Sequence, residues 1–178
     1  MLVASAIPVI GFAAWSGTGK TTLLKALLPM LSERGLRVGV IKHAHHDFDI
    51  DYPGKDSYEL RKAGARQLLI ASRFRQASIR ENPIASEPDL GALVAQFDST
   101  DFDLILVEGF KDENIAKIEL YRRSVGKPPC YVSDDAIIAL ATDEPIEPLR
   151  ELPILDLNNI AAIADFIEAL LSKPPSPP

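Results

Sequence analysis

An apolar strand, a glycine-rich loop and an amphipathic helix follow one another directly near the start of the chain. Val9–Ala14 is short and apolar, as a buried strand requires. The residues after it place two glycines before a Lys-Thr pair, and leucines then recur at helical spacing as far as Leu31. A strand that leads through a loop into a helix is typical of a parallel sheet with covering helices. The chain is therefore predicted to be an α/β protein.

The glycine-rich loop predicts a phosphate-binding site. Gly17 and Gly19 permit the backbone conformations that turn successive N–H groups towards an anion, and the helix that follows adds the positive end of its dipole. Lys20 is expected to reach the β- and γ-phosphates, and the Thr21 hydroxyl to complete the coordination of Mg²⁺. Ala14 replaces the usual first glycine of the motif, which is a small departure because that position mainly ends the strand. The candidate phosphate-binding residues are Ser16, Gly17, Thr18, Gly19, Lys20, Thr21 and Thr22.

A second motif, Asp103–Phe110, is a hydrophobic strand that ends in a carboxylate. Glu108 is expected at the carboxyl end of this strand, where ligands of open α/β sheets bind. There it would hold Mg²⁺ through water or polarise an attacking water, and the alternative is a solvated charge at the end of a strand. Gly109 is expected to offer its N–H to a γ-phosphate. Lys20 and Glu108 are thus the candidate catalytic residues, and Thr21 and Glu108 the candidate metal ligands.

All three histidines of the chain lie between Lys42 and Asp51, among several aspartates. Clustered imidazoles and carboxylates are typical of a Zn²⁺ or Ni²⁺ site. Adjacent side chains of an extended segment point to opposite sides, however, so neighbouring histidines cannot easily share one ion. The preferred interpretation is a loop that approaches the nucleotide or the substrate. The residues whose roles stay open are His43, His45, His46, Asp49 and Asp56.

Several further residues admit two interpretations. Asp143 follows a hydrophobic strand, at a place where base-reading loops often lie, and its carboxylate is able to accept both N1–H and N2–H of guanine. No Asn-Lys-x-Asp motif occurs, so the spacing alone does not separate guanine from adenine. Asp56 or Ser57 is expected to cap a helix, with a role for Asp56 near Mg²⁺ as the alternative. The arginines that either clamp phosphates or form a solvated face are Arg73, Arg75 and Arg80.

Short apolar runs alternate with helical patterns over most of the chain, which favours a mostly parallel sheet with helices on both faces. The predicted strands are Val9–Ala14, Val38–Lys42, Gln67–Ala71, Ala77–Arg80, Leu104–Glu108, Lys117–Tyr121, Ile137–Ala141 and Pro153–Leu157. The predicted helices follow the phosphate loop and also cover Ser57–Ala63, Leu90–Phe97 and a last segment, capped by Asn158 or Asn159, that reaches Leu171.

Two of these strands, Ala77–Arg80 and Lys117–Tyr121, fit a simple alternation of strands and helices less well. In the second, Ile118 and Leu120 face one way and the other side chains face the opposite way. This pattern is typical of an antiparallel strand with one covered face, so we expect an antiparallel extension at the edge of the sheet. An open edge is usually paired or covered, and pairing it with a second copy predicts a twofold homodimer.

Length and charge bound the remaining possibilities. The 178 residues suit one nucleotide-binding domain over 1–172, followed by an extended Pro-rich tail over 173–178. A net charge of −6 without a basic run gives no electrostatic basis for binding nucleic acid. No apolar run reaches the ~18 residues of a membrane span, and no signal peptide is recognisable. The expected location is the cytoplasm.

Three stretches of the chain closely resemble the MobB family of molybdopterin-guanine dinucleotide biosynthesis. They are FAAWSGTGKTTLLKAL, IKHAHHDFDIDYPGKDSYELRKAGA and DLILVEGFKDENIAKIELYR, and they lie between Phe12 and Arg122. The resemblance implies a dimeric GTP-binding protein with a P-loop NTPase-like three-layer fold and weak GTPase activity. The residues that match the family's phosphate loop and acidic strand end are Gly17, Gly19, Lys20, Thr21, Thr22 and Glu108.

The residues themselves lead as far as a nucleotide with Mg²⁺, whereas guanine, molybdopterin and a partner come from the resemblance. It implies that the chain assists a separate nucleotidyltransferase that attaches GMP to molybdopterin. Slow hydrolysis is expected, because no arginine finger or water-positioning Gln is recognisable. The alternatives are a small-molecule kinase that uses the same loop with Arg73 and Arg75, and a metal chaperone that uses the histidines of His43–His46.

Overall fold

The computed structural model describes residues 5–44 and 48–172, and the chain divides into two compact units. Unit 1 is Met1–His43 together with Asp89–Pro178, and unit 2 is Ala44–Pro88. The elements of unit 1 are β1 (Val9–Ala13), α1 (Lys20–Glu33), β2 (Val38–Lys42), α3 (Leu90–Val94), β5 (Leu104–Glu108), β6 (Lys117–Tyr121), η1 (Arg123–Val125), η2 (Cys130–Val132), β7 (Ile137–Thr142), β8 (Ile154–Asp156) and α4 (Ile160–Leu171). The elements of unit 2 are α2 (Asp56–Lys62), β3 (Gln67–Ala71) and β4 (Gln76–Arg80). The predicted tail, 173–178, lies outside the described residues, and a nucleotide-binding domain over 1–172 stays a prediction.

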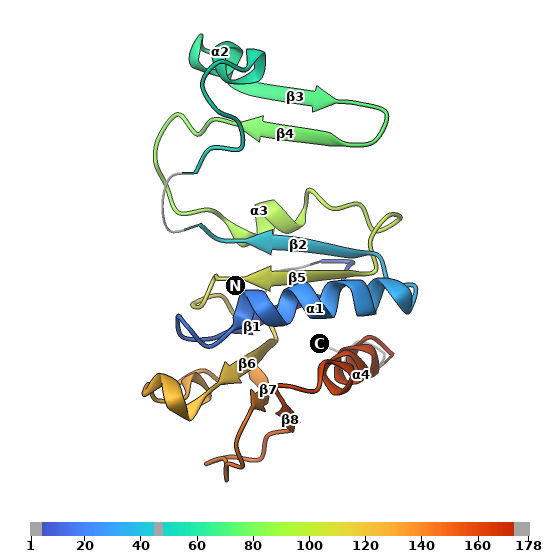
Figure 1. The fold of residues 1–178 in the computed structure, drawn as a ribbon, viewed down its shortest axis with the longest axis vertical. Helices are drawn as coiled ribbons and strands as arrows, with labels where there is room; N and C mark the ends of the chain where they lie inside the picture. Colours follow the sequence, from blue (N-terminus) through green and yellow to red (C-terminus); the bar gives the residue numbers. More distant parts are fainter. Residues whose placement is uncertain (1–4, 45–47, 173–178) are drawn as a thin grey trace. The chain divides into compact units, whose positions relative to one another are not determined.

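Unit 1 is built on a six-stranded sheet in the order β2-β5-β1-β6-β7-β8, in which every neighbouring pair is parallel (Figure 1). The carboxyl ends of all six strands therefore meet at one edge of the sheet. The phosphate loop follows β1, Glu108 ends β5, and Asp143 follows β7, so these candidate residues share that edge. The mostly parallel α/β architecture predicted from the sequence is confirmed.

Different elements cover the two faces of this sheet. On one face, α1 and α4 contact each other and pack their leucines and isoleucines against the strands. On the other face, α3 and the connection 109–116 cover Ile105 and Val107 of β5. All four apolar residues of β5, Leu104–Val107, are completely buried, as expected for a strand enclosed on both sides.

The connection between β5 and β6, residues 109–116, contains no helix, although β1 lies between these two strands. The Gly11 N–H of β1 donates to the Ala116 carbonyl at the end of this connection, at 2.8 Å. A Cβ at Gly11 would lie 3.0 Å from the side chains of both Ile115 and Lys117. Glycine at this position therefore permits the connection to pass close to β1.

Unit 2 holds the antiparallel part of the fold. Strands β3 and β4 pair as a hairpin, which confirms the antiparallel arrangement expected for Ala77–Arg80. This hairpin forms a two-stranded sheet of its own rather than extending the six-stranded sheet, and α2 contacts β3. Arg61 of α2 is buried, and its guanidinium forms ion pairs with Asp49, Asp51 and Glu81 at 2.6, 2.5 and 2.7 Å. This charge cluster ties the segment before α2 to the end of the hairpin.

The prediction that Lys117–Tyr121 is an antiparallel edge strand is wrong. Strand β6 lies inside the sheet and pairs in parallel with β1 and β7. The alternation of apolar and polar residues is misleading here because both faces of the strand are buried, with Lys117 3% exposed and Glu119 0% exposed. Strand β6 therefore offers no open edge for a second subunit.

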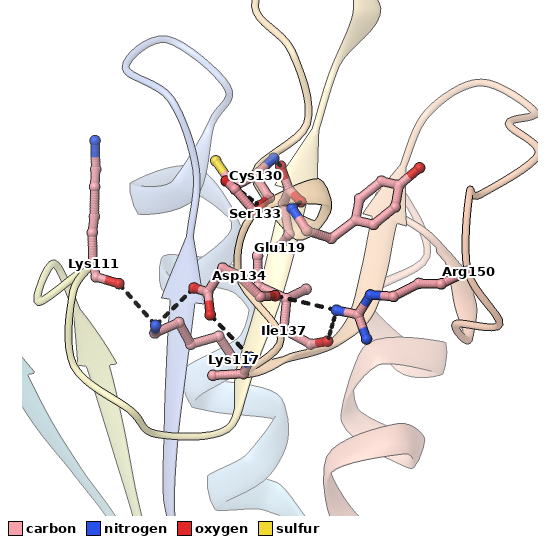
Figure 2. Close-up of polar contacts among 10 residues, drawn as sticks. Lys111, Lys117, Glu119, Cys130, Ser133, Asp134, Ile137 and Arg150 are labelled. Carbon is pink, nitrogen blue, oxygen red and sulfur yellow. Dashed lines mark hydrogen bonds and ion pairs between the residues drawn. The ribbon is translucent and has the colours of Figure 1, made fainter. Parts of the chain in front are cut away.

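Each buried charge of β6 has partners within unit 1 (Figure 2). The Lys117 ammonium donates to the Asp134 carboxylate and to a backbone carbonyl in 109–116, both at 2.8 Å. The Glu119 carboxylate accepts hydrogen bonds from the first two N–H groups of η2, at 2.6 and 2.8 Å. Buried charges are tolerated when they are paired and hydrogen-bonded in this way.

Most helix boundaries follow the predicted signals. Asn159 caps α4 by accepting a hydrogen bond from its first turn at 3.0 Å, as the sequence predicts. The expectation that Asp56 or Ser57 caps the next helix is wrong, because α2 already begins at Asp56. Lys55 occupies the cap position without a side-chain hydrogen bond. Asp56 instead lies in the first turn, where its negative charge interacts favourably with the positive end of the helix dipole.

No helix among residues 5–44 and 48–172 is both long enough and apolar enough to cross a membrane.

Replacing Glu119 by Gln is expected to lower the free energy of unfolding. The amide has one acceptor oxygen for two backbone N–H groups, so one buried donor is left unpaired, at a cost of about 1–3 kcal/mol. Urea denaturation followed by circular dichroism measures the change. Glu144→Gln is the control, because Glu144 is exposed and should change stability by less than about 0.5 kcal/mol. Equal losses in the two variants would contradict the structural role of Glu119.

The pH dependence of the same variant provides an independent measurement. Burial raises the pKa of the Glu119 carboxyl above its usual value. The folded protein then holds this proton to higher pH than the unfolded chain does, so stability falls as pH rises between the two pKa values. Glu119→Gln should remove this part of the slope.

Candidate functional site

The phosphate loop curls between the end of β1 and the start of α1. Gly17 and Gly19 have φ angles of 86° and 100°, in the region that favours glycine. Thr18 between them is buried, and both its N–H and its hydroxyl donate to the Trp15 carbonyl, at 3.3 and 2.8 Å. Ala14 is not among the described residues with positive φ, so alanine fits where the usual motif has glycine.

The start of α1 presents unpaired backbone donors to this loop. The first hydrogen bond within the helix runs from the Leu23 N–H to the Gly19 carbonyl, at 2.9 Å. The N–H groups of Lys20, Thr21 and Thr22 precede this bond and have no helical acceptor. Together with the positive end of the helix dipole, they favour an anion such as a phosphate group at this point.

Glu108 at the end of β5 lies between two ammonium groups. Lys20 Nζ is 3.9 Å from its Oε1, and Lys42 Nζ is 3.9 Å from its Oε2. Both distances exceed that of a hydrogen bond, so a ligand is able to compete with these ion pairs. Burial lowers the pKa of Lys20, and the negative charge of Glu108 opposes this shift. Two ammonium groups against one carboxylate leave a net positive charge that suits a phosphate.

His43, the residue after β2, lies beside Glu108. Its backbone N–H donates to the Glu108 carbonyl at 2.8 Å, and its ring stacks on Phe110 with the ring centroids 4.7 Å apart. Gly109, between Glu108 and Phe110, has a φ angle of 96°, and a Cβ there would lie 2.5 Å from the His43 Cβ. Glycine is therefore required at 109 by both the backbone conformation and the close packing of His43.

Asp143 lies at the same edge of the sheet but is engaged by an arginine. Its Oδ2 forms an ion pair with Arg122 Nη1, and Arg122 Nε donates to the Thr18 carbonyl of the phosphate loop at 3.0 Å. Asp143 Oδ1 is buried without a hydrogen-bond partner in the part of the chain that the structure describes. An unpaired buried acceptor costs about 1–3 kcal/mol.

Residues 9–143 match the family model described as MobB, molybdopterin guanine dinucleotide synthesis protein B. The chain belongs to the MobB family. The match includes the phosphate loop, Glu108 and Asp143.

Two curated relatives support the same conclusion. The chain is 52% identical over 168 residues to the molybdopterin-guanine dinucleotide biosynthesis adapter protein of Escherichia coli strain K12, covering 94% of this chain and 95% of the relative. It is 47% identical over 162 residues to the protein of the same description from Haemophilus influenzae, covering 91% of this chain and 88% of the relative.

Solved MobB structures have the same fold. A crystal structure of molybdopterin-guanine biosynthesis protein B superposes with a TM-score of 0.73 at 29% identity, covering 93% of this chain and 99% of that one. The crystal structure of Bacillus subtilis MobB superposes with a TM-score of 0.73 at 22% identity, covering 94% of this chain and 100% of that one. The P-loop three-layer architecture of this chain is therefore that of the MobB family.

Several of the candidate residues predicted from the sequence lie in unit 2. Arg73, Arg75 and Arg80 are exposed on the hairpin of unit 2. Asp49 pairs with Arg61 in unit 2. His45 and His46 lie outside the described residues.

A dedicated metal cluster has no support in the described chain. Within residues 5–44 and 48–172, no group of three or more His, Cys, Asp or Glu side chains is arranged to hold a metal ion. Burial raises the pKa of the Cys130 thiol to about 11, so this side chain stays protonated and is not a reactive ligand at neutral pH.

Two cationic residues of the candidate site, Lys42 and Arg122, were not predicted from the sequence. Lys42 is the last residue of β2 and Arg122 is the first residue after β6, so both stand at the carboxyl edge of the sheet. For Lys42 a signal was available, because it is a cation at the end of a strand that the sequence predicts to be parallel. Arg122 could not be recognised because its partners are far from it in the chain.

Gly109→Ala is expected to destabilise the protein more than Gly126→Ala. Both glycines have positive φ, which costs alanine about 1–2 kcal/mol. Only Gly109 also has a neighbour in the way, His43, whereas a Cβ at Gly126 would meet nothing within 4 Å. Thermal unfolding of the two variants measures the difference, and a Gly109→Ala protein as stable as Gly126→Ala would contradict the close packing at His43.

Proposed function

We propose that this MobB chain binds GTP with Mg²⁺ at the phosphate loop and acts as an adapter for the nucleotidyltransferase that attaches GMP to molybdopterin. The observation that carries the proposal is the convergence of Lys20 and Glu108 on the loop, with Nζ 3.9 Å from Oε1. The curated relatives are named molybdopterin-guanine dinucleotide biosynthesis adapter proteins, which supports the adapter role.

The phosphate groups would be held by the backbone of the loop and by one side chain. The N–H groups of Ser16, Gly17 and Gly19–Thr22 would supply donors, and Lys20 a positive charge, whereas the Thr18 N–H already donates to the Trp15 carbonyl. Gly109 follows Glu108 with a positive φ angle, and we propose that its N–H contacts the γ-phosphate. Lys20 and Glu108 would act directly at the phosphate that is hydrolysed.

The residues present also fit Mg²⁺. Thr21 is exposed at the first turn of α1, and the Glu108 carboxylate makes only the two long ion pairs among the described residues. Hydroxyl and carboxylate oxygens are ligands that Mg²⁺ accepts together with phosphate and water. The ion would neutralise phosphate charge, while Thr21 and Glu108 fix its position.

Guanine would be recognised by Asp143. Its unpaired Oδ1 offers an acceptor, and the carboxylate as a whole matches the adjacent N1–H and N2–H of guanine. Hydrolysis would be slow. The two cations that pair with Glu108 are Lys20 and Lys42, and a lysine lacks the planar guanidinium with which an arginine finger stabilises the transition state.

Other parts of the interpretation stay predictions. These are molybdopterin as the bound substrate, the cytoplasmic location, and the lack of nucleic-acid and membrane partners. No contact among the described residues favours the kinase or the metal-chaperone alternative over the adapter.

Lys20→Ala is expected to weaken GTP binding by about 10–100-fold, because charge-assisted hydrogen bonds to phosphate contribute roughly 1.5–3 kcal/mol. Isothermal titration calorimetry with GTP and Mg²⁺ measures the change. Lys25→Ala is the matched control, since Lys25 lies on the exposed side of α1. Equal GTP affinity of wild type and Lys20→Ala would overturn the assignment of the phosphate site.

We also propose that the chain forms a homodimer through unit 2. Several large apolar side chains there are exposed, including Phe48 at 71%, Leu69 at 68% and Phe74 at 79%. The hairpin also leaves one unpaired edge on each of its strands within the unit, and such edges favour pairing with another chain.

Sedimentation equilibrium at micromolar concentration is expected to give about twice the mass of the 19.4 kDa chain. Leu69→Asp should shift the equilibrium towards the monomer, because it adds charge to the exposed apolar surface of unit 2. Leu149→Asp, at a residue of unit 1 that is 81% exposed, should leave the mass unchanged. A wild-type protein that sediments only as a monomer would refute the dimer.

A further inference from the structure

Arg122 connects three segments of unit 1 through one guanidinium group. Its Nε donates to the carbonyl of Thr18 in the phosphate loop, at 3.0 Å. Its Nη1 pairs with Oδ2 of Asp143, which follows β7, and its Nη2 lies 3.5 Å from Oδ1 of Asn158, which follows β8. The three partners follow three different strands, so Arg122 links loops along the carboxyl edge of the sheet.

The contact with Thr18 bears on the phosphate site. In a trans peptide, the carbonyl oxygen and the N–H of the next residue point in opposite directions. While Arg122 holds the Thr18 carbonyl, the Gly19 N–H is directed away from the guanidinium. Gly19 has a φ angle of 100° and little intrinsic preference for one conformation, so this contact fixes the direction of one donor of the loop.

The contact with Asp143 bears on the base. Oδ2 is taken by the ion pair, and Oδ1 has no hydrogen-bond partner among the described residues. The planar guanidinium favours a defined orientation of the carboxylate, which a flexible ammonium group would not impose. Without Arg122, the Asp143 side chain would be free to rotate and would no longer present its oxygens in one direction.

We propose that Arg122 is a positioning residue that orients Asp143 for guanine and the Thr18–Gly19 peptide for phosphate. Base recognition and phosphate binding are then coupled through one side chain that touches neither part of the nucleotide. This inference rests on the proposed function, GTP binding at the phosphate loop.

The neighbouring Arg123 provides a matched control. It forms an ion pair with Glu144 at 3.6 Å, and the two side chains are 66% and 51% exposed. Arg123 thus has the same charge, the adjacent position and a carboxylate partner next to Asp143. Unlike Arg122, it makes no contact with the phosphate loop in the described part of unit 1.

The experiment measures the dissociation constants of GTP, ITP and ATP by calorimetry for the wild type, Arg122→Ala, Arg122→Lys, Arg123→Ala and Asp143→Ala. ITP keeps N1–H but lacks the 2-amino group, so the ratio of GTP to ITP affinity reports on base recognition. Arg122→Ala is expected to weaken GTP binding by about tenfold or more and to bring this ratio close to one, because two hydrogen bonds to charged or loop groups are lost. Arg123→Ala should leave both values unchanged.

A role in packing alone predicts a different result. It would weaken GTP, ITP and ATP by the same factor and leave the GTP/ITP ratio at the wild-type value, and this outcome would overturn the proposal. If Arg122→Ala does not fold, Arg122→Lys provides the test. Lysine keeps the charge but cannot serve Thr18 and Asp143 together, so its GTP/ITP ratio should fall, and a wild-type ratio would overturn the proposal.

Asp143→Ala separates this inference from the proposed function. If Asp143→Ala keeps the wild-type GTP/ITP ratio, the assignment of guanine recognition to Asp143 fails, and the role of Arg122 fails with it. If Asp143→Ala loses the ratio and Arg122→Ala keeps it, only the role of Arg122 is refuted. Loss of the ratio in both variants supports the proposal.

Discussion

The parallel pairing of β1 with β5 on one side and β6 on the other determines where every candidate ligand contact of unit 1 lies. Phe12 of β1 is in register with both Glu108 of β5 and Ile118 of β6. Both faces of this part of the sheet are buried, so a shift of one residue would turn apolar side chains towards the wrong layer. Core packing therefore holds the phosphate loop next to Glu108 on one side and next to Arg122 on the other.

Buried charges maintain the same arrangement from within the sheet. Lys117 and Glu119 point into enclosed surroundings, and their partners come from the connection 109–116, from Asp134 and from η2. Removing one partner of such a group leaves an uncompensated buried charge, which is strongly unfavourable. The segments on either side of β6 are thus fixed to this strand by polar contacts as well as by apolar packing.

The sequence was sufficient for the elements that carry strong local signals. The burial of β5 and the strand–loop–helix order around Gly17 and Gly19 depend only on neighbouring residues, and both were predicted correctly. The orientation of β6 was not predictable in this way, because Lys117 and Glu119 produce the same alternation on a half-exposed strand and on a buried strand with paired charges. Their partners become visible only once the chain is folded. The same holds for Arg122, whose contacts with Thr18 and Asp143 join residues that are distant in the sequence.

The connection 109–116 also has ends that are fixed by contacts within unit 1. Loops at the surface usually accept insertions and deletions, because their ends have room to adjust. Here the first residue, Gly109, packs against His43. The carbonyl of the last residue, Ala116, accepts a hydrogen bond from Gly11, and the next residue, Lys117, forms a buried ion pair with Asp134. One residue more or less would displace Lys117 or pull Glu108 away from Lys20. We therefore expect insertions and deletions in 109–116 to be tolerated less well than in loops whose ends have room to adjust.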